Sequence, residues 1–219
     1  MKLFLDTADF DEVKKWYDHD ILDGITTNPT HLSKVGGNPL EQIKKLCKLL
    51  PHKIVNVQVT EESADKIYKQ AQQIAKIADN IIVKIPCHPD YYATIKKLVQ
   101  EGIKINITLV FSLVQGLMMA KLGVAYISPF VGRLDDSGGN GTELLVDLRH
   151  MIDYYQYETA ILAASVRDYS QVRHAILAGA DIITISAALL EKIIQHPLTD
   201  RGMQQFHDDW LKLHIAHFP

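Results

Sequence analysis

The sequence has few cysteines, no excess of positive charge and no long apolar run. Its two cysteines, Cys47 and Cys87, lie far apart and form no Cys-x-x-Cys pair, which argues against a zinc site or a disulfide framework and is typical of a reducing cytosol. Lys and Arg number 23 against 26 Asp and Glu, so no basic surface for nucleic acid is expected. No apolar run could span a membrane, and the one between Met1 and Asp6 is too short for the core of a signal peptide. We therefore expect a cytoplasmic protein that binds neither nucleic acid nor a membrane.

Strand-like and helix-like stretches alternate along the whole chain. The 219 residues are 47% hydrophobic, which is enough to bury a sizeable core. Short apolar runs rich in β-branched residues are typical of buried strands, and they span residues 3–5, 24–27, 54–59, 80–86, 103–109, 124–127, 160–164 and 182–185. The stretches between them repeat apolar residues at helical spacing, as Val13 and Trp16 do after the capping-box pair Asp9 and Glu12.

This alternation predicts an α/β protein. Eight strand–helix units in a chain of this size indicate a closed eight-stranded parallel barrel, the (β/α)8 TIM barrel, because an open parallel sheet of eight strands would normally be larger and leave edges to cover. An open doubly wound sheet is the alternative, but no glycine fingerprint for a dinucleotide follows the first strand. We expect residues 1–219 to form a single barrel domain.

The run at residues 80–86 carries a lysine, Lys84, in the middle of a predicted buried strand. Lysines are seldom fully buried, so its amine could reach the surface along its apolar stem or pair with a buried acid. The other interpretation is an amine that is kept neutral by loss of solvent and is therefore nucleophilic, as Schiff-base chemistry with a carbonyl substrate requires.

Polar side chains collect where the predicted strands end. In a TIM barrel these ends form the face that carries the active site. The polar strand-end residues are Asp6, Thr26, Asn28, Gln58, Lys84, Asn106, Thr108, Ser128, Arg133, Ser165, Arg167 and Ser186. A single Ser, Thr or Asn at such a position is usually a helix cap or turn former, but a set in register around one lysine favours a binding site.

The types of residue at these ends limit the chemistry. None of the ten histidines lies at a predicted strand end, and Asp6 is the one acid there. A metal site, a paired-carboxylate glycosidase and a Glu/His isomerase each need histidines or further acids, which the predicted strand ends lack. One lysine and one carboxylate are what a class I aldol reaction needs, with Lys84 forming the imine and Asp6 moving the proton. Arg133 and Arg167, with Ser165 beside the second, are typical of a phosphate clamp.

The same strand ends carry a set of short motifs. They are Phe4-Leu5-Asp6-Thr7-Ala8, Gly24-Ile25-Thr26-Thr27-Asn28-Pro29, Val83-Lys84-Ile85-Pro86, Asn106-Ile107-Thr108, Ile127-Ser128-Pro129-Phe130-Val131-Gly132-Arg133 and Ala164-Ser165-Val166-Arg167. Taken together they resemble the small transaldolase family, which includes the fructose-6-phosphate aldolases. The resemblance runs from the first predicted strand to the last helix.

This resemblance implies a role for each matching residue. Lys84 is similar to the Schiff-base lysine of the family and Asp6 to its general acid and base for the C3–C4 bond. The residues that resemble those around the dihydroxyacetone unit are Asn28, Asn106, Thr26 and Ser128. Thr108 resembles the hydroxyl that, with Gln58, positions the water used in forming and hydrolysing the imine. Arg133, Ser165 and Arg167 resemble the phosphate site, and the family uses no metal and no organic cofactor.

Two positions separate the branches of the family, and here they disagree. Gln58 matches the aldolases, where transaldolases usually have glutamate, whereas Phe130 matches the transaldolases, where aldolases have tyrosine. Glutamine can still hold a water by hydrogen bonds, so we give Phe130 more weight. We expect a transaldolase of the non-oxidative pentose phosphate pathway that moves a dihydroxyacetone unit from fructose 6-phosphate or sedoheptulose 7-phosphate to erythrose 4-phosphate or glyceraldehyde 3-phosphate. The alternative is a fructose-6-phosphate aldolase that releases free dihydroxyacetone.

The end of the chain predicts a helix that the barrel does not need. Met203, Phe206, Trp210 and Leu213 form an apolar stripe on a helix expected over residues 199–215. Such a stripe favours contact with another subunit, and the family resemblance implies a ring, often a pentamer doubled to a decamer. A hypothesis of another class is a barrel that binds a sugar phosphate without turning it over, but the presence of Lys84 and Asp6 together argues against it.

Overall fold

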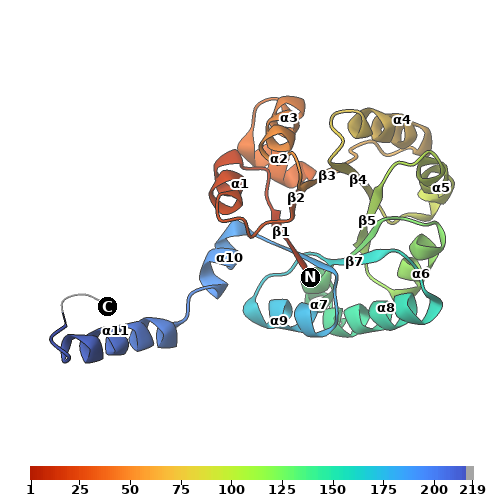
Figure 1. Ribbon diagram of the computed structural model, residues 1–219. Coiled ribbons are helices and arrows are strands. Elements are labelled where there is room, and N and C mark those ends of the chain that lie inside the picture. The colour runs from red at the N-terminus through yellow and green to blue at the C-terminus, as the bar shows by residue number, and fades with distance from the viewer. Residues whose placement is uncertain (216–219) are drawn as a thin grey trace.

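The computed structural model describes residues 1–215 and confirms the TIM barrel. Eight parallel strands pair in chain order and close through pairing of the first with the last (Figure 1). The strands are β1 (Lys2–Asp6), β2 (Gly24–Thr26), β3 (Ile54–Gln58), β4 (Ile81–Pro86), β5 (Ile105–Val110), β6 (Tyr126–Pro129), β7 (Ala160–Ala163) and β8 (Ile182–Ile185). All the helices except the last surround this barrel, and because the strands are parallel, their carboxyl ends lie at one face.

Helical spacing located the longer helices, while short ones were missed. The helices are α1 (Phe10–Tyr17), α2 (Pro29–Val35), α3 (Pro39–Leu49), α4 (Ala64–Ala75), α5 (Tyr92–Gln100), α6 (Leu113–Lys121), α7 (Val131–Asp136), α8 (Gly141–Tyr155), α9 (Tyr169–Leu177), α10 (Ala187–Ile193) and α11 (Pro197–Leu211), with a 3-10 turn, η1 (Pro89–Tyr91). The sequence did not predict α2, α7 and α10, because none is long enough to repeat an apolar face twice. They follow β2, β6 and β8, so they shape the loops at the site face.

The sixth strand begins two residues later than its apolar run predicts. The expected strand was 124–127, whereas β6 covers Tyr126–Pro129. Val124 is buried, and its carbonyl oxygen accepts a hydrogen bond from Thr159 Oγ1 (2.8 Å). The apolar side chain of Val124 thus packs in the turn that follows Gly123, whose φ is 77°, and is not part of the strand. As a result Ser128 lies within the strand and points into the barrel interior, where it is fully buried.

The last helix leaves the barrel. Figure 1 shows α11 extending away from the strands and the other helices, and none of its side chains is buried. Met203 is 66% exposed and Phe206 is 75% exposed. The helix begins at Pro197 and ends at Leu211, so Leu213 lies in the turn that follows it. The exposed side chains of Met203 and Phe206 are therefore not covered by the barrel of the same chain.

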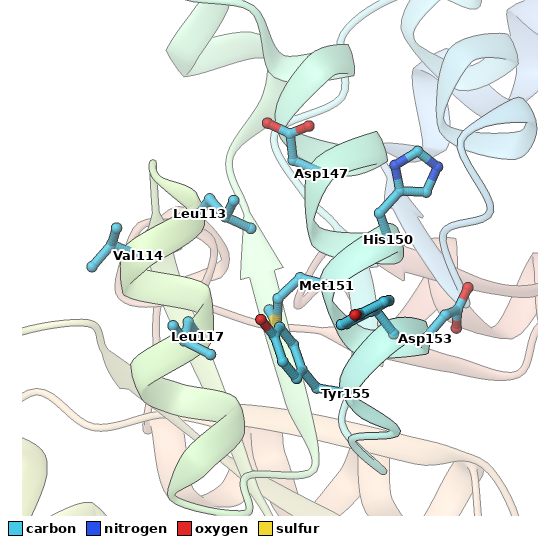
Figure 2. A pocket seen from close by; sticks show the side chains of 9 residues that line it. Leu113, Val114, Leu117, Asp147, His150, Met151, Asp153 and Tyr155 are labelled. Atoms are coloured by element: carbon cyan, nitrogen blue, oxygen red, sulfur yellow. The ribbon is translucent and has the colours of Figure 1, made fainter.

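An apolar groove of about 850 Å³ lies in the outer helical layer, between α6 and α8 (Figure 2). Its apolar walls are formed by Leu113, Val114, Leu117, Met151, Tyr154 and Tyr155. Tyr154 is 81% exposed. No helix within residues 1–215 is long and apolar enough to cross a membrane.

Candidate active site

Lys84 is buried, and its amine has no hydrogen-bond partner among the described residues. Lys84 lies in β4, in register with Gln58 on β3 and Asn106 on β5, and is only 3% exposed. Within residues 1–215 its Nζ atom makes no hydrogen bond and has no carboxylate within 4.0 Å; the ring of Phe130 lies 5.8 Å away. Among the described residues the lysine therefore neither extends to the outer surface nor forms an ion pair with a buried acid, and this arrangement favours the interpretation of a nucleophilic amine.

Burial also changes the pKa of this amine. Loss of solvent lowers the pKa of Lys84 below its ordinary value of 10.5, and the positive charge of Arg133 lowers it further, while the negative charge of Asp6 acts in the opposite direction. The net result is a lowered pKa, which increases the fraction of neutral, nucleophilic amine near neutral pH.

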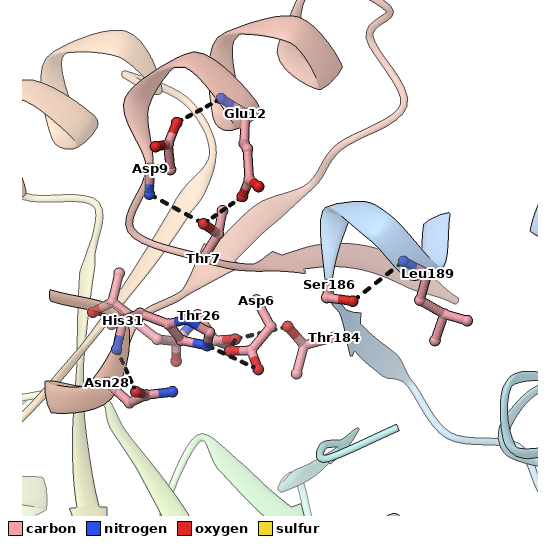
Figure 3. A network of polar contacts seen from close by, with 12 residues as sticks. Asp6, Thr7, Asp9, Glu12, Thr26, Asn28, His31, Thr184, Ser186 and Leu189 are labelled. Carbon is pink, nitrogen blue, oxygen red and sulfur yellow. Dashed lines mark hydrogen bonds and ion pairs between the residues drawn. The ribbon is translucent and has the colours of Figure 1, made fainter. Parts of the chain in front are cut away.

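Asp6 ends β1 and is held by both of its carboxylate oxygens (Figure 3). Thr26 Oγ1 donates a hydrogen bond to Oδ1 (2.7 Å), and the same hydroxyl lies 2.7 Å from Thr184 Oγ1 on β8. His31 Nε2 lies 3.4 Å from Oδ2. Burial raises the pKa of Asp6, but hydrogen bonds from His31 and Thr26 and the charges of His31 and Lys84 outweigh it, so the pKa falls below 3.8. Asp6 is therefore a carboxylate at neutral pH.

Lys84 and Asp6 face one pocket of about 650 Å³ at the carboxyl ends of the strands. Most of the residues predicted for the site line it: Asp6, Asn28, Gln58, Lys84, Thr108, Phe130, Arg133, Ser165 and Arg167. It is also lined by Pro29, Thr30, His31, Lys34, Leu109, Ala164 and Thr184. Side chains from distant parts of the sequence thus converge on the amine and the carboxylate.

Three predicted residues lie beneath the pocket lining instead. Thr26, Asn106 and Ser128 are fully buried. Ser128 Oγ donates to Asn106 Oδ1 (2.6 Å), and Asn106 Nδ2 donates to Asn56 Oδ1 (2.9 Å). Thr26 supports Asp6 in the same way. The structure therefore gives these residues supporting contacts, and their direct contact with a substrate stays a prediction.

Asn28 has a structural role and also lines the pocket. Its Oδ1 accepts a hydrogen bond from the backbone amide of His31 (2.9 Å) and so caps the N-terminus of α2. Because the oxygen is used by the cap, the amide nitrogen is the group left to face the pocket.

Two residues in the pocket wall have left-handed backbone conformations. Leu109 has φ 60° and Ser165 has φ 58°. Such conformations cost a residue other than glycine about 1–3 kcal/mol and are concentrated at functional sites. Next to Leu109, the buried hydroxyl of Thr108 has no hydrogen-bond partner among the described residues. The end of β5 therefore forms part of the pocket wall in a conformation that lowers the free energy of unfolding.

Of the two predicted phosphate-binding arginines, Arg133 lies in α7, which follows β6, and Arg167 lies on the loop after β7. The guanidinium of Arg133 stacks on the ring of Phe130 at 4.9 Å, and Arg167 forms an ion pair with Asp136. The helix and the loop touch at Gly132, where a Cβ atom would come within 2.3 Å of the Ser165 carbonyl oxygen. Only glycine allows this approach, which brings both arginines to one side of the pocket.

Prediction from strand ends missed some members of the site. Thr184 is the one polar residue inside the apolar run of β8, and this could have indicated an inward-facing contact. His31 lies in the first turn of α2, a helix that the sequence did not predict. The Asn28-Pro29 pair, an N-cap followed by proline at the first helical position, is the signal that could have located this helix.

Comparisons with known proteins agree with this geometry. The family model described as Transaldolase/Fructose-6-phosphate aldolase matches residues 3–216. The chain belongs to this family. A probable transaldolase of Lactiplantibacillus plantarum is 47% identical over 210 residues, which cover 96% of each chain. A probable transaldolase of Bartonella henselae is 44% identical over 212 residues, which cover 97% of each chain.

A third relative in the transaldolase/fructose-6-phosphate aldolase family is a probable transaldolase of Brucella abortus, 44% identical over 212 residues and 97% of each chain. The expected family membership is thus confirmed along almost the whole sequence. Within residues 1–215 no three His, Cys, Asp or Glu side chains form a group that could hold a metal ion.

The lowered pKa of Lys84 can be measured directly. Trace labelling of amines with acetic anhydride, read by mass spectrometry on the peptide that contains Lys84, should reach half of its maximal rate below pH 10.5. Asp6→Asn removes the negative charge that raises this pKa and should shift the midpoint further down, while Arg133→Met should shift it up. A midpoint at or above 10.5, or shifts of the same sign in both variants, would contradict the proposed environment.

Proposed function

We propose that the protein is a transaldolase that transfers a dihydroxyacetone unit between sugar phosphates through a Schiff base on Lys84. The observation that carries the proposal is the burial of Lys84, whose amine forms no hydrogen bond within residues 1–215, in a pocket that also contains the carboxylate of Asp6. Fructose 6-phosphate and sedoheptulose 7-phosphate are the proposed donors. Erythrose 4-phosphate and glyceraldehyde 3-phosphate are the proposed acceptors, as in the non-oxidative pentose phosphate pathway.

The first half of the reaction uses both groups. The neutral amine of Lys84 adds to the C2 carbonyl of the ketose phosphate, and loss of water gives a protonated imine. Asp6 takes the proton of the C4 hydroxyl, the C3–C4 bond breaks, and its electron pair moves toward the imine nitrogen to give an enamine. The aldose phosphate leaves with its new C=O group.

The second half reverses these steps on another aldehyde. C3 of the enamine attacks the aldehyde carbon of the acceptor, and Asp6 returns its proton to the oxygen that becomes the new C4 hydroxyl. Water then adds to the imine, and the new ketose phosphate leaves Lys84 as a free amine. Thr108, whose hydroxyl has no partner among the described residues, and Gln58 are the proposed holders of that water.

The arginine side of the pocket suits the phosphate. Arg133, Ser165 and Arg167 line the same pocket as Lys84, and guanidinium groups bind phosphate oxygens by charge-assisted hydrogen bonds. A phosphate dianion there would compete with Asp136 for Arg167. We propose that Asn28 binds the hydroxyl groups of the dihydroxyacetone unit, together with Asn106, Thr26 and Ser128, which lie behind it.

The contact between Phe130 and Lys84 favours transfer over release of free dihydroxyacetone. The Phe130 ring lies 5.8 Å from the Lys84 Nζ atom and offers no hydroxyl to order or protonate water there. The enamine would then persist until an acceptor arrives. Gln58 supports the alternative, a fructose-6-phosphate aldolase, because it stands in register beside Lys84 without a carboxylate that could act as a base.

We further propose that the reaction takes place in the cytoplasm, since the thiols of Cys47 and Cys87 are free within the described residues. The proposed chemistry uses the amine and the carboxylate and assigns no step to a metal or an organic cofactor.

The exposed side of α11 supports assembly with other copies. We propose that the apolar stripe of α11 packs on a neighbouring copy in a homo-oligomeric ring, a pentamer or a decamer. Phe206 and Met203 have no cover from the barrel of their own chain. Exposed apolar surface of this kind is typical of contacts between subunits.

The proposed reaction predicts an acceptor-dependent product. Fructose 6-phosphate should give glyceraldehyde 3-phosphate rapidly with erythrose 4-phosphate and at least about tenfold more slowly without it, because the enamine needs an acceptor. Borohydride should trap an adduct at Lys84, and Lys84→Met should abolish both the adduct and the product. Fast release of dihydroxyacetone without acceptor would establish the aldolase instead, and no adduct in the unaltered protein would exclude the Schiff base.

Phe130 provides a test of the choice between transfer and release. Phe130→Tyr places a hydroxyl near the imine and should raise the ratio of free dihydroxyacetone to transferred product by about tenfold, within the range of general acid–base effects. The matched control is Phe111→Tyr, since the Phe111 and Phe130 ring centroids are 6.0 Å apart and, of these two rings, only that of Phe130 lies near the Lys84 Nζ atom. Equal ratios in both variants would contradict the role given to Phe130.

Assembly through α11 can be measured by light scattering after size-exclusion chromatography. The double substitution Met203→Ser with Phe206→Ser should lower the measured mass toward that of one chain, because it removes the apolar contact. Arg201→Ser with Asp208→Ser lies on the other side of the helix and should leave the mass unchanged. A single-chain mass for the unaltered protein, or an unchanged mass after the apolar substitutions, would contradict the proposal.

A further inference from the structure

We propose that His31 is a positioning residue, which fixes the carboxylate of Asp6 for proton transfer in the reaction proposed above. The inference rests on that proposed function and adds to it a residue that lies outside the strand ends. Figure 3 shows the His31 ring beside Asp6, next to Thr26 and Asn28.

The position of His31 is fixed from its backbone outward. It lies in the first turn of α2, and its backbone amide donates to Asn28 Oδ1 (2.9 Å). Asn28 is itself the residue that links the end of β2 to this helix. The ring is therefore attached to a backbone that the pocket holds in place, and the side chain is only 23% exposed.

The ring contacts the one part of Asp6 that nothing else restrains. Oδ1 of Asp6 is bound by Thr26, whose hydroxyl contacts Thr184. Oδ2 has His31 Nε2, 3.4 Å away, as its nearest recorded polar neighbour among the described residues. A carboxylate held at one oxygen can still turn about its Cβ–Cγ bond. A contact at the second oxygen prevents this rotation.

The chemistry of the two groups fixes which of them can donate to the other across this 3.4 Å contact. An ionised carboxylate can only accept hydrogen bonds, so Nε2 of His31 must carry the hydrogen. Each oxygen of Asp6 then has one donor and keeps further lone pairs for the substrate hydroxyl. His31 takes up no proton from the substrate in this arrangement, so its effect on the reaction passes through Asp6.

Other charged groups near the ring do not replace this contact. Lys34 on the same helix lines the pocket but is exposed and forms no ion pair among the described residues. A smaller cavity of about 280 Å³, also lined by Asp6 and His31, contains Asp9 and Glu12. Glu12 accepts from Thr7 Oγ1 (2.7 Å) and Asp9 caps α1, so both acids have partners of their own.

Three variants separate positioning from a direct role in binding. His31→Leu removes the donor and should lower kcat for transfer from fructose 6-phosphate to erythrose 4-phosphate by about 10- to 100-fold, the loss expected when a reacting group is misplaced by about 1 Å. KM should stay within about twofold, because substrate contacts are kept. His31→Gln places an amide nitrogen near the site of Nε2 and should recover most of kcat, whereas the shorter His31→Asn should not.

A second readout distinguishes this role from a purely structural one. Borohydride trapping of added dihydroxyacetone on Lys84 forms the imine without breaking a carbon–carbon bond, so it does not need Asp6 as a base. The adduct yield of His31→Leu should therefore match that of the unaltered protein while its transfer rate falls. A parallel loss of adduct and rate would assign His31 to the fold, and a raised KM with unchanged kcat would assign it to substrate binding; both overturn the inference.

The outcome does not depend on one variant folding. If His31→Leu does not fold, the comparison between the Gln and Asn variants decides, and equal rates in these two overturn the inference. The proposed function is tested separately by the unaltered protein. Absence of its Lys84 adduct refutes the Schiff base itself, whereas an adduct and transfer with no effect of His31→Leu refute only the role of His31.

Discussion

Burying Lys84 with no carboxylate within 4.0 Å of its amine among the described residues costs free energy, and the rest of the barrel offsets that cost. The strands on either side hold the lysine in register between Gln58 and Asn106, and the apolar interior keeps water away from its stem. A closed barrel suits this task, since every backbone group beside the lysine is paired within the sheet and a single side chain can point inward without opening an edge. The result is an amine with a lowered pKa in a site that also contains a carboxylate with a lowered pKa.

The polar groups around this amine form two chains of hydrogen bonds. One joins Thr184, Thr26 and Asp6, and the other joins Ser128, Asn106 and Asn56. A buried polar group without a partner is costly, whereas a satisfied network is rigid and fixes one arrangement of its members. The pocket is thus supported from below by groups that bind one another, and the residues above them are free to bind a ligand.

The strand pattern could be predicted from the sequence because buried parallel strands need uninterrupted apolar runs, and each of the eight runs became a strand. Lys84 and Asp6 could be predicted because the fold gathers strand ends at one face. The later start of β6 could not be predicted, because Val124 is apolar on account of its packing in a turn and does not belong to the strand. His31 could not, because α2 is too short to show helical spacing. The pairing of Arg167 with Asp136 depends on two loops meeting in space, which no local pattern records.

The capping of α2 by Asn28 has a consequence for how this pocket can evolve. Any exchange of Asn28 changes the amide that faces the pocket and also uncaps a helix, at a cost of about 1 kcal/mol. Gln58 carries no such second role, since its side chain forms no hydrogen bond within the described residues, whereas the ring of Phe130 also packs against Arg133 and Phe111. Exchanges between related enzymes should therefore be slow at Asn28 and faster at Gln58. Divergence in reaction outcome can accumulate at Gln58 without uncapping a helix.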